Sequence, residues 1–409
     1  MRRTVCAGIV ITLVAAAGLR SRVAAGNGQN DEPVPAVRAA SILAAPERSG
    51  AHFTVDEPVT VSGYFYEFHL TSDYGPFTAV GRSQLATRID EIRAIAALQD
   101  VSKSQVFLAS AGGAVVDIGK GAASAVTDPV ATAKGIGTGI KRFGVNLGRA
   151  SQRAVDKEGG ADTGQSGATT AADTVLGVSS AMREWARKVK ADPYTTNTVL
   201  RDALKSIAKV DTAGSIVTKV VVPIPAVVGT TAAVGDLVWS KDPEALRKLN
   251  EERVRGLGAS EKVASAFFRN GWYTLTLQTR IVAALDAVKK PGCADYLESA
   301  AAADNEREAL FFVESAEMLQ RHHAKAPVDK LLTDSRAIVA AAGSSATLLA
   351  PLDVVRSTAA VRTALGEIAA RARKELGAST LVLGISGTVS DRARQDATRI
   401  GWTVRHSGA

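Results

Sequence analysis

Alternating hydrophobic and polar residues near the amino end predict a β-hairpin. Tyr64, Tyr66, Phe68 and Leu70 alternate with other residues, residues 71–75 (TSDYG) carry turn-forming side chains, and residues 77–80 are again extended. Hydrophobic residues then recur with helical spacing between residues 85 and 96, and Ser83 stands where a helix N-cap is expected. This pattern predicts an α+β module that begins at residue 51 and, with the glycine-rich stretch that follows, extends to residue 155.

A glycine-rich stretch between residues 109 and 150 has helical spacing of its hydrophobic residues. Gly135 and Gly139, and then Gly144 and Gly148, are four residues apart, a spacing that lets two helices approach closely. Each glycine inside a helix costs about 1 kcal/mol relative to alanine, so these helices need a packing partner. We interpret the stripe as packed inside the protein, with contact to a protein partner or an anionic membrane surface as the alternative. The candidate residues are Ile118, Val126, Val130, Ile136, Ile140, Phe143 and Leu147, with the cations Lys134, Lys141 and Arg142.

Helical periodicity dominates the middle of the chain. Residues 156–172 are polar and glycine-rich, which predicts a flexible linker. A helical domain is then expected over residues 173–327, with Glu314 and Glu317 on one face of its last helix, where we interpret them as solvated charge. The domain opens with a hydrophobic seam whose members are spaced three and four apart; the seam consists of Val175, Val178, Met182, Trp185 and Val189.

Strand and helix patterns alternate at the carboxyl end. A hairpin is expected over residues 337–352, a helix ends at Gly377, a strand covers residues 380–385, a helix capped by Ser390 follows, and a last strand covers residues 402–405. This order predicts a small α/β domain over residues 328–409. The fold class predicted for the whole chain is α+β and predominantly helical, with an N-terminal β-hairpin plus helices, a central helical bundle and this small C-terminal domain.

The first 25 residues have the pattern of a secretory signal. Two arginines precede an uncharged hydrophobic run from Val5 to Leu19, and the small residues Val23, Ala24 and Ala25 fit a cleavage site after Ala25. The run is shorter than the roughly 20 residues of a spanning helix. We therefore expect export to the periplasm or cell envelope, with an uncleaved N-terminal anchor as the alternative. Residues 26–50 contain Gly, Asn and Pro and are interpreted as a linker.

Cleavage would change both the charge and the cysteine content. The formal net charge of +8 falls to +4, because residues 1–25 contain four arginines and no acidic residue. A charge of +4 gives little support to nucleic-acid binding, so no nucleic acid is expected as a partner. Cys293 would remain without a second cysteine for an internal disulfide, and we interpret it as a small buried hydrophobic residue.

The sequence contains no complete motif of the phosphate-binding, nucleophile-elbow or metal-site type. Gly119-Lys120 has Ala114 and Gly121 where a phosphate-binding loop needs glycine and a hydroxyl residue. The run around Ser386 lacks the spacing of a nucleophile elbow. The histidines lack the spacing of a metal site. The carboxyl end is basic, but interleaved aspartates indicate a solvated face; its cations are Arg392, Arg394, Arg399, Arg405 and His406. We therefore predict no catalytic, cofactor or metal-binding residues, and no cofactor.

Two resemblances concern short segments. Residues 380–408, TLVLGISGTVSDRARQDATRIGWTVRHSG, resemble the closing strand–helix–strand of restriction-endonuclease-like domains. That family's cleavage site needs an acidic residue followed by Glu-x-Lys on a hairpin, and the hairpin here offers only Asp353. The phrases DPVATAKGIGTGIKRFG and DPEALRKLNEERVRGLG are similar to segments of uncharacterised exported bacterial proteins. Neither resemblance implies an activity for this chain.

The functional hypothesis from sequence is an exported, non-catalytic interaction or structural protein of the bacterial cell envelope. The signal, the glycine-rich amphipathic stretch and the incomplete catalytic motifs favour it over an enzyme. The alternative is a hydrolase whose site is assembled from residues that are distant in sequence, because such sites are defined in space rather than by spacing.

Overall fold

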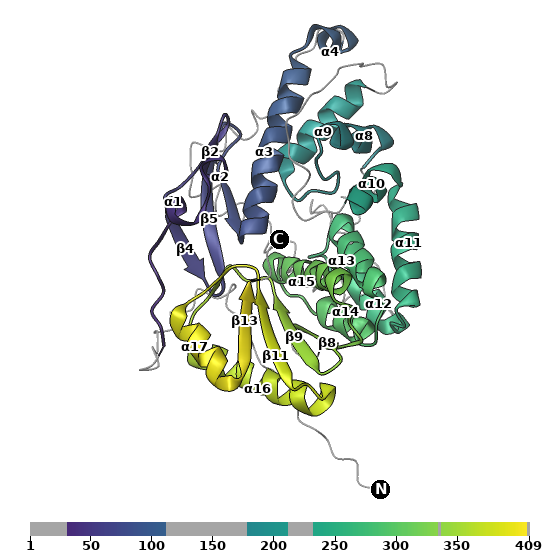
Figure 1. The fold of residues 1–409 in the computed structure, drawn as a ribbon. Coiled ribbons are helices and arrows are strands. Elements are labelled where there is room, and N and C mark those ends of the chain that lie inside the picture. Colours follow the sequence, from purple (N-terminus) through teal and green to yellow (C-terminus); the bar gives the residue numbers. More distant parts are fainter. Residues whose placement is uncertain (1–30, 112–177, 212–231, 334–336, 407–409) are drawn as a thin grey trace, which may run out of the picture.

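An antiparallel sheet forms the amino-terminal part of the protein. The computed structural model describes residues 31–111, 178–211, 232–333 and 337–406 (Figure 1). The central strand of this sheet, β5, pairs with β4 and β3 along one edge and with β6 along the other. Its side chains alternate between the two faces, so Tyr66, Phe68 and Leu70 are all buried. The strands are β1 (Val37–Arg38), β2 (Ser49–Gly50), β3 (Phe53–Val55), β4 (Pro58–Ser62), β5 (Phe65–Ser72) and β6 (Phe77–Val80).

Helices occupy the middle of the chain, and many of them begin after a Ser, Thr, Asn or Asp residue that caps the amino end. Ser179, Asn197, Asp242, Ser260, Thr274 and Asn305 each accept a hydrogen bond from the first turn of the helix that they cap. The expected hydrophobic seam is buried in its described part, from Val178 to Val189. The helices are α3 (Arg82–Ser102), α4 (Gln105–Ser110), α8 (Ser180–Lys188), α9 (Thr198–Val210), α10 (Ala232–Ser240), α11 (Pro243–Gly256), α12 (Glu261–Arg269), α13 (Leu275–Val288), α14 (Cys293–Ala301) and α15 (Glu306–Lys325), with the short α1 (Ala39–Ile42) and α2 (Ala45–Arg48) before them.

A mixed sheet forms the carboxyl-terminal part, in the order β13-β11-β9-β8-β7. Strands β9, β11 and β13 are parallel, and α16 (Ala359–Leu376) and α17 (Asp391–Ile400) connect them. Both helices pack on one face of the sheet, while helices that include α15 contribute to the core on the other face (Figure 1). The strands are β7 (Lys330–Leu332), β8 (Ile338–Ala342), β9 (Ser345–Ala350), β11 (Thr380–Ile385) and β13 (Trp402–His406).

A short parallel ribbon leads into the two carboxyl-terminal helices. Strand β10 (Val354–Val355) pairs with β12 (Thr388–Val389), and the Ser390 amide continues the pairing by donating to the Val355 carbonyl at 3.0 Å. Helix α16 begins just after β10 and helix α17 just after β12. The ribbon therefore places the amino ends of α16 and α17 next to each other.

The predicted fold class is wrong in its balance of helix and sheet. The protein is a mixed α+β fold with substantial sheet content, whereas the sequence indicated a predominantly helical chain with an N-terminal hairpin, a central helical bundle and a small C-terminal α/β domain. The predicted hairpin exists as β5 and β6, but four further strands join it. Strands β1, β2 and β3 are two or three residues long, which is too short for alternation to identify them, and part of the predicted 26–50 linker supplies β1 and β2.

The start of α3 differs from the prediction, whereas the carboxyl-terminal elements agree with it. Helix α3 follows Gly81 at a φ of 97°, and Ser83 does not cap it but donates its hydroxyl to Glu314. The predicted elements at the carboxyl end are confirmed, including the turn between β8 and β9 and the Gly377 cap of α16. Within the described residues, none of the helices combines the length and the hydropathy that membrane crossing requires.

Candidate functional site

The stripe predicted from the glycine-rich stretch lies in residues 112–177, outside the described residues. Its ten candidate residues, from Ile118 to Leu147, therefore remain a prediction. In the described ranges, no group of three or more His, Cys, Asp or Glu side chains could hold a metal ion.

Three single residues with reactive side chains have structural partners. The Ser386 hydroxyl donates to the Leu352 carbonyl at 3.0 Å, and this bond holds the turn after β11 against the end of β9. Cys293 is 1% exposed, and burial raises the pKa of its thiol, which disfavours the reactive thiolate. His323 Nδ1 accepts a hydrogen bond from the Val328 amide at 2.9 Å.

A buried polar network joins α3, the loop before α9, α13 and α15. The Glu91 carboxylate accepts hydrogen bonds from Arg88 at 2.7 Å, from Thr195 at 2.5 Å and from Asn197 at 3.0 Å. In the same loop, Asp192 Oδ1 accepts from the Thr276 hydroxyl at 2.6 Å and from the Tyr194 amide at 2.8 Å. Burial raises the pKa of Asp192 to about 6, and the nearby Glu91 charge adds to that shift.

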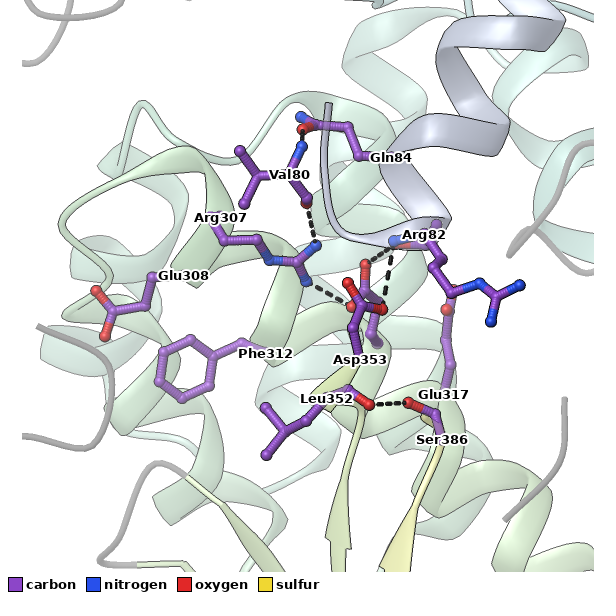
Figure 2. A network of polar contacts seen from close by, with 12 residues as sticks. Val80, Arg82, Gln84, Arg307, Glu308, Phe312, Glu317, Leu352, Asp353 and Ser386 are labelled. Carbon is purple, nitrogen blue, oxygen red and sulfur yellow. Dashed lines mark hydrogen bonds and ion pairs between the residues drawn. The ribbon is translucent and has the colours of Figure 1, made fainter. Parts of the chain in front are cut away.

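Arginines of this network pair with carboxylates of α15. Arg280 donates through Nε and Nη2 to the two oxygens of Glu317, at 2.8 and 2.9 Å. Arg307 donates to Glu314 at 2.5 Å and to the Val80 carbonyl at 3.0 Å (Figure 2). The prediction that Glu314 and Glu317 are solvated is therefore wrong. Arg280 of α13 pairs with Glu317, and Arg307, two turns earlier on α15 itself, pairs with Glu314.

Asp353 lies just beyond the carboxyl end of β9 and connects the two sheets. Figure 2 shows its carboxylate facing the start of α3. One oxygen accepts from the Tyr66 amide at 3.0 Å, and the other accepts from the Arg82 amide at 3.4 Å. Burial raises the pKa of Asp353 to about 6, against the lowering effect of these two bonds. Since both oxygens are engaged by backbone amides, Asp353 primarily joins the amino-terminal sheet to the carboxyl-terminal sheet.

A second polar cluster holds the first described residues of the chain against the amino ends of α16 and α17. Glu32 Oε2 accepts from the Ser357 amide at 2.8 Å and from the Ser390 hydroxyl at 2.5 Å. Asp31 Oδ1 accepts from the Ala359 amide of α16 at 2.6 Å and lies 3.7 Å from Arg362. We name this cluster the acidic-segment site; it consists of Arg356, Ser357, Ala359, Arg362 and Ser390, occupied by Asp31 and Glu32.

The electrostatics of the acidic-segment site favour an anion. Burial alone raises the pKa of Glu32, but the bonds from Ser390 and Ser357 and the charges of Arg356 and Arg392 bring it below its usual value. Two helix amino ends add partial positive charge at the same place. The site also lies beyond the carboxyl ends of parallel strands, where open α/β sheets bind ligands.

The remaining charges near the site largely neutralise one another. Asp396 accepts from the Ser357 hydroxyl at 2.5 Å, lies 3.7 Å from Arg362 and pairs with Arg399 at 3.0 Å. Without Asp31 and Glu32, Arg362 would keep Asp396 but lose the Asp31 carboxylate, and Arg356 would lose its bond to the Glu32 carbonyl. The cations predicted to form a solvated face, Arg392, Arg394, Arg399, Arg405 and His406, are all exposed, and the Arg392 charge also lowers the pKa of Glu32.

The sequence contained part of the signal for this site. Ser390 was expected as a helix cap, and Asp31-Glu32 is an acidic pair inside the predicted linker. More than 300 residues separate the pair from its partners, so no local pattern links them. Comparisons with protein-family models, with curated proteins and with solved structures found no match, so the site rests on its own geometry.

Proposed function

We propose that this protein is a non-catalytic interaction protein that recognises a carboxylate- or phosphate-bearing group at the acidic-segment site. The observation that carries the proposal is that the carboxylates of Asp31 and Glu32 accept hydrogen bonds at the amino ends of α16 and α17. Charge-assisted hydrogen bonds of this kind are about twice as strong as neutral ones. The predicted signal over residues 1–25 supports export, so the site of action proposed is the periplasm or cell envelope, with an uncleaved N-terminal anchor as the alternative.

A hydrolase remains the second candidate, and Asp353 is the observation that favours it. A carboxyl group whose pKa is raised to about 6 at the carboxyl end of a parallel strand has a value suited to general acid–base chemistry. Its two backbone bonds argue for a structural role instead. We therefore place binding ahead of catalysis.

The proposal is tested by removing the negative charges of the docked segment without shortening the chain. The double substitution Asp31→Asn and Glu32→Gln removes both charges while it keeps the size of each side chain. We expect the full-length double variant to bind millimolar inorganic phosphate in isothermal titration calorimetry at least tenfold more tightly than the wild type does, because the wild-type site is occupied.

A matched control changes a similar residue elsewhere. Asp295 is an exposed acidic residue in the first turn of α14. Like Asp31 it lies at a helix amino end, but it is not part of the acidic-segment site. Asp295→Asn should leave phosphate binding at the wild-type level. Absence of phosphate binding by a double variant that is folded by circular dichroism would contradict anion recognition at this site.

A further inference from the structure

We infer that the ligand of the acidic-segment site is an acidic peptide and that Asp31-Glu32 is a tethered copy of it that competes for the site. This inference rests on the proposed function, because it names the partner of the same site. The reasons are the main-chain contacts of Glu32, the side-chain contacts of Asp31 and Glu32, and the exposure of residues 33–36.

The site contacts the main chain of the acidic segment as well as its charges. The Glu32 amide donates to the Ser357 carbonyl at 2.8 Å, and Arg356 Nη1 donates to the Glu32 carbonyl at 2.6 Å. A free phosphate or acetate ion has no N–H group for the Ser357 carbonyl. An extended peptide satisfies both groups at once, as in recognition by strand addition.

The side-chain contacts require two acidic residues in succession. The Glu32 carboxylate bridges Ser357, between β10 and α16, and the α17 cap Ser390, whereas the Asp31 carboxylate reaches the first amide of α16. The two helix amino ends are therefore served by two neighbouring carboxylates. A peptide with one acidic residue would leave one of these ends without its anion.

An exposed tether connects the docked pair to the rest of the fold. Residues 33–36 are all exposed, and the next strand, β1, begins at Val37. Val34, 56% exposed, is the exposed large hydrophobic residue in the described part of the chain. The acidic pair is thus held by its own contacts rather than by packing of residues 33–36, which suits a segment that another peptide can displace.

A competing peptide must displace the tethered Asp31-Glu32 segment, whose effective concentration at the site depends on the length of the tether. A short tether gives the attached segment a millimolar effective concentration at its site. A free peptide of the same sequence therefore binds the wild type weakly and binds strongly only when the tethered copy loses its charges. Partner proteins with an Asp-Glu pair in an extended segment, at high local concentration, are the class of ligand that the site would accept.

The experiment uses a fluorescently labelled peptide with the sequence of residues 27–36, NGQNDEPVPA. Fluorescence anisotropy is measured with the full-length wild type, with the Asp31→Asn and Glu32→Gln double variant, and with Asp295→Asn as control. We expect the double variant to bind the peptide at least tenfold more tightly than the wild type and the control do. The peptide NGQNNQPVPA should not bind.

A second peptide isolates the main-chain contact. Replacement of the amide at the glutamate position by an ester removes the N–H donor but keeps both carboxylates, and we expect roughly fivefold weaker binding. If phosphate binds the double variant but the peptide binds no more tightly than phosphate, or if the ester has no effect, peptide recognition is wrong while anion recognition stands. If neither phosphate nor peptide binds the folded variant, the proposed function fails as well.

Discussion

Substitution of Asp192 by asparagine tests whether the buried polar network works against stability at neutral pH. Asp192 lies among Glu91, Arg280 and Thr276, and burial raises the pKa of Asp192 to about 6 from an ordinary value of 3.8. Its side chain accepts hydrogen bonds from Thr276 and Tyr194, and both fall on Oδ1. Asparagine keeps an acceptor oxygen at that position, so the substitution removes the charge while it preserves these two bonds.

The magnitude follows from the two pKa values. An aspartate with a raised folded pKa takes up a proton in the folded state before the unfolded state does, so its contribution to stability grows as the pH falls from about 7 towards 4 and is absent above the folded pKa. At pH 5 the folded group is about nine-tenths protonated, whereas the unfolded group is almost fully ionised. Integration between pH 7 and pH 5 gives about 1.3 kcal/mol for this residue.

The assay is urea denaturation of wild type and Asp192→Asn at pH 7 and pH 5. We expect the stability of the wild type, relative to the variant, to rise by about 1.3 kcal/mol between pH 7 and pH 5. Asp202→Asn, at an exposed position on α9, provides a control in which this change is absent or much smaller. A pH-independent difference between wild type and Asp192→Asn would refute the raised pKa and the desolvation argument behind it.

Three further predictions concern Gly387, Cys293 and Glu32. Gly387→Ala should destabilise the fold by about 3 kcal/mol in denaturant titration, because its Cβ would lie 2.1 Å from the Asp353 carbonyl, whereas Gly366→Ala in α16 meets no atom and should be neutral or stabilising. The Cys293 thiol should react with a thiol reagent only after unfolding, measured in a Cys6→Ser background; rapid reaction of the folded protein would contradict its burial. Glu32 has a lowered pKa, so the stabilisation lost in Glu32→Gln should be present at pH 7 and disappear as the pH falls below about 4.5, as measured by the difference in Tm.

Sequence patterns predicted those elements whose partners are close in the chain. The hairpin of β8 and β9 and the succession of α16, β11, α17 and β13 were all predicted, because each has a periodic stretch bounded by a cap or turn residue. The amino-terminal sheet was underestimated for the opposite reason. Strands of two or three residues, such as β1 and β2, carry no measurable period, and their pairing is defined only by the folded sheet.

Candidate site residues were harder to predict than elements. Glu317 has the helical spacing of a solvated charge, and only the folded structure places Arg280 of α13 against it. The acidic pair Asp31-Glu32 is equally ordinary in a polar segment. Its significance depends on two helix amino ends that the β10–β12 ribbon brings together, and no local pattern in the sequence reports that juxtaposition.

The two groups of carboxylates respond to acid in opposite directions, and this difference constrains how the acidic-segment site can open. Asp192 and Asp353 have pKa values raised to about 6, so protonation between pH 7 and pH 5 stabilises the core. Glu32 has a lowered pKa and remains ionised over the same range, so its bonds to Ser357 and Ser390 persist. Mild acidification therefore favours the folded state through these two aspartates and leaves Glu32 ionised in its site. Release of Asp31-Glu32 near neutral pH then requires a competing acidic partner rather than a change of pH.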